Sequence, residues 1–87
     1  MSKKTFIIGE IAGHIGKIER MDEVKRKIFI IQLLRNIGKP LGNTFDGSAN
    51  HIADLLESNC VSTDVEIADI QTEILEIIKT GRINDMI

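Results

Sequence analysis

Apolar residues recur at helical spacing in the last third of the chain. Four isoleucines follow one another at intervals of three, four and three, which is the stripe of an amphipathic helix. They are Ile67, Ile70, Ile74 and Ile77. Thr63 and Glu66 have the spacing of a capping box, and Gly81 is typical of the position just beyond a helix end. The pattern predicts a helix from about Thr63 to Thr80, with Thr63 as its N-cap residue.

A second predicted helix, from about Asp22 to Ile37, is apolar on most of its surface. Gly38 and Pro40 end it, because the residue before a proline avoids helical geometry. So broad an apolar surface exceeds what the core of a small monomer needs, and we expect the helix to serve both the core and a subunit interface. Its stripe consists of Val24, Ile28, Ile31 and Leu34, and the expected interface residues are Ile28, Phe29, Ile30 and Leu33.

The segment 5–18 mixes apolar residues with glycines. The apolar row is Ile8, Ile11, Ile15 and Ile18, and a second row about 100° around a helix is Gly9, Gly13 and Gly16. Interior glycines oppose a helix by about 1 kcal/mol each relative to alanine. A row of small residues nevertheless lets another backbone or a ligand approach closely. We therefore favour a helix with the glycine row as a binding surface over the alternative, a short strand at 6–8 followed by a glycine loop.

The remaining residues complete an all-α prediction. Turn-forming residues at 42–47 precede a short predicted helix from about Ser48 to Ser58, and residues 82–87 are expected to be frayed. A chain of 87 residues forms one domain, spanning 1–87. We expect a small bundle of three to four helices, built on a helical hairpin and assembled into an oligomer.

Composition predicts an aliphatic core, since isoleucine accounts for 17 of the 87 residues and tryptophan and tyrosine are absent. Cys60 is the single cysteine, which excludes an internal disulfide and a zinc site built on paired cysteines. We expect it to be buried as a small apolar side chain. His14 and His51 lie too far apart in the sequence to form a metal motif, so the sequence predicts no metal site and no cofactor.

The two halves of the chain carry opposite charge. Residues 1–40 hold nine Lys or Arg and four Asp or Glu, whereas residues 41–87 hold two and nine. Such asymmetry is typical of a basic arm for an anionic partner, or of halves that attract each other within one chain or between chains. We favour mutual attraction of the halves.

The cations near the glycines offer an alternative function. A phosphate loop of Walker type is excluded, because it needs glycine where Ile11 stands and a hydroxyl residue where Ile18 follows Lys17. An anion can still bind without that motif, and the chain would then sequester a phosphorylated small ligand such as a nucleotide. The candidate residues are Gly9, Gly13, Gly16, Lys17, Arg20, Lys25 and Arg26.

A helix-turn-helix within 50–74 is a third possibility, which the charges disfavour. The helix that would read DNA is acidic and holds no Lys or Arg before Lys79, whereas groove-reading helices need cations for the phosphates. Its acidic residues are Asp64, Glu66, Asp69 and Glu73. The longest aliphatic or aromatic run, at 28–31, is far shorter than the about 20 residues that span a bilayer, so we expect a cytoplasmic protein without a membrane partner.

No set of residues in the sequence has the pattern of a catalytic site, and we do not expect an enzyme. The function we expect is protein–protein association by a small non-catalytic helical protein of bacterial or phage type. It would associate with itself and bind a host or partner protein as a regulator, inhibitor or adaptor.

Overall fold

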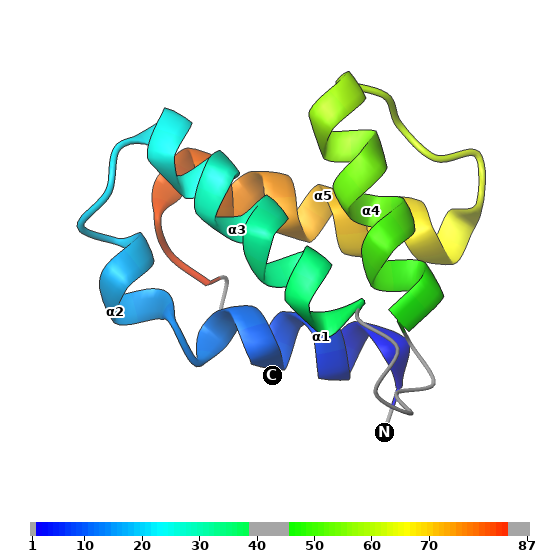
Figure 1. Ribbon diagram of the computed structural model, residues 1–87, viewed down its shortest axis with the longest axis horizontal. Helices are drawn as coiled ribbons and strands as arrows, with labels where there is room; N and C mark the ends of the chain where they lie inside the picture. The colour runs from blue at the N-terminus through cyan, green and yellow to red at the C-terminus, as the bar shows by residue number, and fades with distance from the viewer. Residues whose placement is uncertain (1, 39–45, 84–87) are drawn as a thin grey trace.

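The computed structural model describes residues 2–38 and 46–83, which form five helices and no strand (Figure 1). The all-α prediction is confirmed. The helices are α1 (Lys3–Ala12), α2 (Ile15–Ile18), α3 (Glu23–Ile37), α4 (Asp46–Ser58) and α5 (Val65–Thr80). The expected three to four helices become five because the N-terminal segment, predicted as one helix, divides in two.

The N-terminal segment is helical, so the alternative of a strand and a glycine loop is wrong. Ser2 is the N-cap residue of α1, and its hydroxyl oxygen accepts a hydrogen bond from the backbone N–H of Thr5. The helix ends at Gly13, and His14 departs from helical geometry before α2 begins. Within α1 the buried residues are Ile7 and Ile11, whereas the predicted Ile8 is only partly buried.

The predicted α3 is confirmed, with Asp22 as its N-cap residue and Gly38 as its C-cap residue. Pro40 lies outside the described residues, as do Gly42 and Asn43 of the predicted turn. The broad apolar surface predicted for α3, a stripe that Phe29, Ile30 and Leu33 widen, divides into a buried row and a part that is exposed. Ile30, Leu34 and Ile37 face the core, whereas Val24 and Ile28 are exposed over 69% and 53% of their surface.

Helix α5 begins one residue later than predicted. Asp64, not Thr63, is its N-cap residue, and the Asp64 carboxylate accepts a hydrogen bond from the backbone N–H of Ile67. A carboxylate at this position also suits the positive end of the helix dipole, which explains the shift by one residue. The predicted stop is confirmed, since Gly81 has the left-handed φ of 74°.

The core is aliphatic, as predicted, and consists of isoleucine, leucine and alanine side chains from all five helices. Figure 1 shows α3 crossing in front of α5, with α4 beside both and α1 below them, and α3 contacts α1, α4 and α5. Helix α5 contributes the most buried residues, so it is the central element of the bundle. No described helix is long and apolar enough to cross a membrane.

Ion pairs between side chains of the described residues all join the basic half of the chain to the acidic half. On α1, Lys3 pairs with Glu66, and Lys4 lies 3.0 Å from Asp69. Lys4 also pairs with Glu73, and on α3 the guanidinium of Arg35 pairs with Asp54 and Glu57 of α4. The charge asymmetry therefore serves attraction within the chain, as the sequence indicated.

The described part of the C-terminal segment is only partly consistent with fraying. Ile83 packs against the core, and the backbone N–H of Arg82 donates a hydrogen bond to the Thr80 hydroxyl. Residues 84–87 lie outside the described residues.

Candidate functional site

The most distinctive surface feature is a cleft where α3, α4 and α5 meet. Among the described residues, five large apolar side chains are strongly exposed, and four of them line this region: Val24, Ile28, Val61 and Leu75. The part between α3 and α5 has a volume of about 430 Å³, and a neighbouring part along α3 of about 490 Å³ shares Glu23, Lys27 and Ile78 with it. The two parts adjoin at these residues, and together we call them the α3–α5 face.

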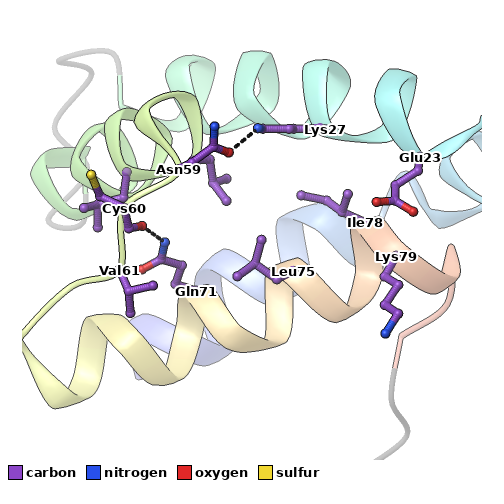
Figure 2. Close-up of a pocket in the computed structure, with 11 residues that line it drawn as sticks. Glu23, Lys27, Asn59, Cys60, Val61, Gln71, Leu75, Ile78 and Lys79 are labelled. Atoms are coloured by element: carbon purple, nitrogen blue, oxygen red, sulfur yellow. Dashed lines mark hydrogen bonds between the residues drawn. The ribbon is translucent and has the colours of Figure 1, made fainter.

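Helix α5 supplies the floor of the cleft. Figure 2 shows Leu75 and Ile78 projecting from α5 into the space below α3. Leu75 lies one residue beyond the buried Ile74 on the helix, so it points out of the core while its neighbour points in. Leu55 and Leu56 from α4 complete the apolar lining.

Polar side chains fix the walls of the cleft. The Lys27 ammonium on α3 donates a hydrogen bond of 2.8 Å to the side-chain oxygen of Asn59, which closes one wall (Figure 2). Asn59 has a left-handed φ of 56°, and this turns the chain out of α4. The rim also carries the carboxylates of Glu23 and Glu57, so both signs of charge surround the apolar lining.

Gln71 holds the connection between α4 and α5 against the bundle. Gln71 is only 2% exposed, and its amide nitrogen donates a hydrogen bond of 2.6 Å to the backbone oxygen of Cys60 (Figure 2). Its amide oxygen accepts a hydrogen bond of 3.2 Å from the backbone N–H of Ser62. A buried amide is stable there because both of its polar ends are satisfied. The loop that bears Val61 is thereby fixed at one end of the cleft.

The prediction that Cys60 is buried is wrong. The side chain is exposed and lines the cleft, because the chain turns out of α4 at Asn59 while Gln71 holds the Cys60 backbone oxygen against the bundle. No histidine is found among the described residues that line the cleft, and no described group of three or more His, Cys, Asp or Glu side chains is placed to hold a metal. The chemistry that the cleft offers is apolar contact with a charged rim.

The predicted interface residues divide between surface and core. Ile28 lies on the α3–α5 face, whereas Ile30 has no exposed surface and belongs to the core. The prediction that Ile30 is an interface residue is therefore wrong. Ile28 and Ile30 are two positions apart, which places them on nearly opposite sides of the helix. Phe29 and Leu33 are half-buried and pack against the core, and the Phe29 ring meets the His14 ring edge-on at 5.7 Å between centroids.

Comparison with known proteins finds no matching family model, curated protein or solved structure. The function must therefore be argued from the residues of the site.

Of the basic residues predicted to bind an anion, Arg26 is engaged by backbone oxygens within the chain. Arg26 does not face solvent as a free cation, since its guanidinium donates hydrogen bonds to the backbone oxygens of Ile18, Ile78 and Lys79. A cation is favourable there because those carbonyls lie at the C-terminal ends of α2 and α5. Lys17, Arg20 and Lys25 are exposed, and anion binding by them stays a prediction.

No other element of the described chain packs closely against the glycine row. A Cβ on Gly9 or Gly16 would meet no atom within 4 Å, and one on Gly13 would be in ordinary contact with backbone oxygens of α1. The expected approach of another backbone is absent among the described residues because α1 and α2 are separate helices whose glycines face outward. Contact of these glycines with a ligand or a second chain stays a prediction.

The acidic surface of α5, considered above as a DNA-reading helix, is engaged within the chain. Glu66, Asp69 and Glu73 are the residues that pair with the lysines of α1. Helix α5 also buries one side against the core, through residues that include Ile70, Ile74 and Ile77.

Val61 and Leu75 are surface residues of the site that the sequence pattern does not predict. The one sequence feature that marks these two residues is that they fall outside the predicted apolar stripes. That feature does not show where they lie in space. For α3 a clearer signal exists, because Val24, Ile28 and Ile31 have the same spacing of four and three as the core residues Ile30, Leu34 and Ile37.

Proposed function

We propose that this chain is a non-catalytic protein that acts by protein–protein association through the α3–α5 face. The observation that carries the proposal is the gathering of exposed apolar side chains there, since four of the five strongly exposed large apolar residues of the described chain line it. Single exposed apolar residues are ordinary on a protein surface, whereas a contiguous group with a polar rim is typical of an interaction site.

The energetics of the face support association. Val24 and Ile28 remain exposed over more than half of their surface, and covering them would contribute about 1 kcal/mol each. Leu75 and Val61 add further apolar surface across the cleft. The chain holds no Trp or Tyr, so binding would depend on aliphatic packing rather than on aromatic anchors. A protein of this kind suits the role of a regulator, inhibitor or adaptor.

The test compares two substitutions of exposed apolar residues. Ile28→Asp places a charge in the α3–α5 face, and Val65→Asp places the same charge at a residue that is 85% exposed and does not line the cleft. We expect wild type and Val65→Asp to associate, with themselves or with a captured protein, and Ile28→Asp to lose that association. The proposal would be contradicted if the wild-type chain is monomeric and captures only the proteins that Ile28→Asp also captures.

A further inference from the structure

The half-buried side chain of Arg26 joins α3 to the ends of two other helices. Its Nε donates a hydrogen bond of 3.1 Å to the backbone oxygen of Ile18, the last residue of α2. Its Nη1 donates hydrogen bonds of 3.1 Å and 3.3 Å to the backbone oxygens of Ile78 and Lys79, in the last turn of α5. Figure 1 shows α2, the start of α3 and the end of α5 at the same end of the molecule. A planar guanidinium with five N–H donors can bind both helix ends at once.

Helix α2 has little stability of its own. It is a single turn of four residues that includes Gly16, and its N-cap residue His14 makes no side-chain hydrogen bond to it. So short a helix is unfavourable by itself, because the first turn fixes several residues for one hydrogen bond. Ile18 is the one buried residue of α2. Among the described residues, Arg26 makes the one hydrogen bond that joins α2 to another helix.

The end of α5 leaves room for the same side chain. Gly81 follows the helix with a left-handed φ of 74°, and a Cβ on it would lie 2.6 Å from Nη2 of Arg26. Carbonyl groups of a last helical turn have no partner within the helix, so the guanidinium satisfies two of them. Ile78 and Lys79 also line the cleft, so the turn that binds Arg26 forms part of the α3–α5 face.

We propose that Arg26 is a latch that makes α2 and the last turn of α5 open and close as one unit. The two segments lie far apart in the sequence, and each is bonded to the same guanidinium. Release of the guanidinium therefore frees both, and displacing it at one segment removes its bond to the other. Proteins open locally in such cooperative units, at a lower free energy than global unfolding. The coupling transmits a change at α2 to the α3–α5 face, whatever partner that face binds.

Hydrogen exchange of single backbone amides, followed by NMR, tests the latch. The reporter amides are those of Glu19 and Met21, which donate to carbonyls of α2, and that of Gly81, which donates to the Ile77 oxygen of α5. We expect wild type to protect all three amides to a similar degree. Arg26→Met is expected to accelerate their exchange by about 5- to 30-fold. Exchange of the two amides at α2 at the rate of an unstructured chain in wild type would contradict the proposal.

Gly81→Ala provides the sharpest measurement, because it would act on α2 from the end of another helix. The new Cβ would displace the guanidinium, so exchange at Glu19 and Met21 is expected to accelerate. In an Arg26→Met background the same substitution is expected to leave these two amides unchanged, since the latch is already absent. Unchanged exchange at Glu19 and Met21 when Gly81→Ala is made alone would overturn the proposal, even if Arg26→Met failed to fold.

Arg35→Met, on the same helix, is the matched control. The Arg35 guanidinium binds residues of α4, which include Asn50 and Asp54. Its loss is expected to leave the three reporter amides unchanged, and in wild type these should exchange faster than the amide of the core residue Ile52 on α4. Equal acceleration of the reporter amides by Arg26→Met and Arg35→Met would indicate a general loss of stability and overturn the latch. Reporter amides that exchange as slowly as Ile52 would show that no local unit opens, with the same consequence.

Discussion

The guanidinium of Arg26 occupies the space beside the α carbon of Gly81, where its Nη2 would lie only 2.6 Å from a Cβ. Gly81 ends α5 with a left-handed φ of 74°, and Arg26 reaches from α3 to the last carbonyls of that helix at Ile78 and Lys79. Its Nε also donates to the Ile18 oxygen at the end of α2. One side chain thus joins the ends of two helices to a third, and glycine is the residue that leaves room for it.

Gly81→Ala is expected to destabilise the protein by about 2 kcal/mol. A left-handed φ costs a residue with a Cβ about 1 kcal/mol or more, and displacement of the guanidinium adds to it. Arg26→Met alone is expected to cost about 2–3 kcal/mol, because helix-terminal carbonyls lose a charged donor. Urea unfolding monitored by circular dichroism measures both values.

The double variant separates steric from conformational effects. Without the guanidinium, Gly81→Ala should cost only the conformational part, about 1 kcal/mol. Equal costs of Gly81→Ala in the presence and absence of Arg26 would show that the two residues are not coupled.

Gln71→Glu is expected to make stability depend on pH. The new carboxylate would face the Cys60 backbone oxygen, to which the amide now donates, and repulsion would favour its protonated form in the folded state. Its pKa would rise above the ordinary value of about 4.3, so the variant should resemble wild type below that pH and lose about 2–3 kcal/mol as pH increases. Thermal unfolding from pH 4 to 8, with wild type as reference, measures this. A constant difference across that range would contradict it.

Two glycines should respond oppositely to alanine. A Cβ on Gly9 meets open space, so Gly9→Ala is expected to stabilise α1 by up to about 1 kcal/mol. A Cβ on Gly38 would collide with the side chain of Asn50, which itself donates to the Gly38 oxygen, so Gly38→Ala should destabilise. Chemical denaturation compares the pair. Loss of stability or assembly in Gly9→Ala would instead favour the predicted approach of a second chain or ligand to the glycine row.

Neighbouring isoleucines of α3 should differ in their effect on stability. Ile30→Ala removes a fully buried side chain and is expected to cost about 2–4 kcal/mol. Ile28→Ala removes an exposed one and should change monomer stability by less than about 0.5 kcal/mol. Unfolding at submicromolar protein concentration, which disfavours self-association, compares the two. Similar costs would contradict the division of α3 into a buried row and an exposed part.

Lys4→Gln is expected to weaken the attachment of α1 to α5 in a way that depends on salt and pH. A hydrogen bond to Asp69, and a smaller effect from a second one to Glu73, raise the pKa of Lys4. The ammonium form is therefore favoured in the folded state. Its contribution is present below the ordinary pKa of 10.5 and is lost as pH rises through the folded value. The difference from wild type should also shrink in 1 M salt, whose screening length is about 3 Å. Lys17→Gln, at an exposed lysine, is the control, and an equal effect there would contradict the role of the ion pairs.

The helices with strong periodic stripes were predictable from local information. The bounds of α3 and α5 follow from apolar spacing and from Gly38 and Gly81, and the structure confirms them within a residue or two. The N-cap of α5 was misplaced by one residue, since both Thr63 and Asp64 can cap a helix. The break between α1 and α2 was not predictable, because glycine permits both a continuous helix and an end.

The candidate site was only partly predictable. Sequence analysis singled out Ile28 on α3, but it also included the buried Ile30, because periodicity alone does not show which of two stripes faces the core. The position of Arg26 among other cations predicts an anion as its partner, whereas its partners are carbonyls 8 and 52 residues away. Contacts between residues so distant in the chain leave no local pattern.

The sequence by itself determined an all-helical chain with an aliphatic core, two charged halves that attract each other, and a helix with more apolar surface than one core requires. These properties follow from spacing, composition and charge, which are read along the chain. The tertiary structure alone decided which stripe of α3 is buried, that Val61 and Leu75 lie with Val24 and Ile28 on one face, and that Arg26 is engaged by helix ends. The reason is physical: burial and hydrogen bonding depend on which helices pack together, and that is settled by the whole chain at once.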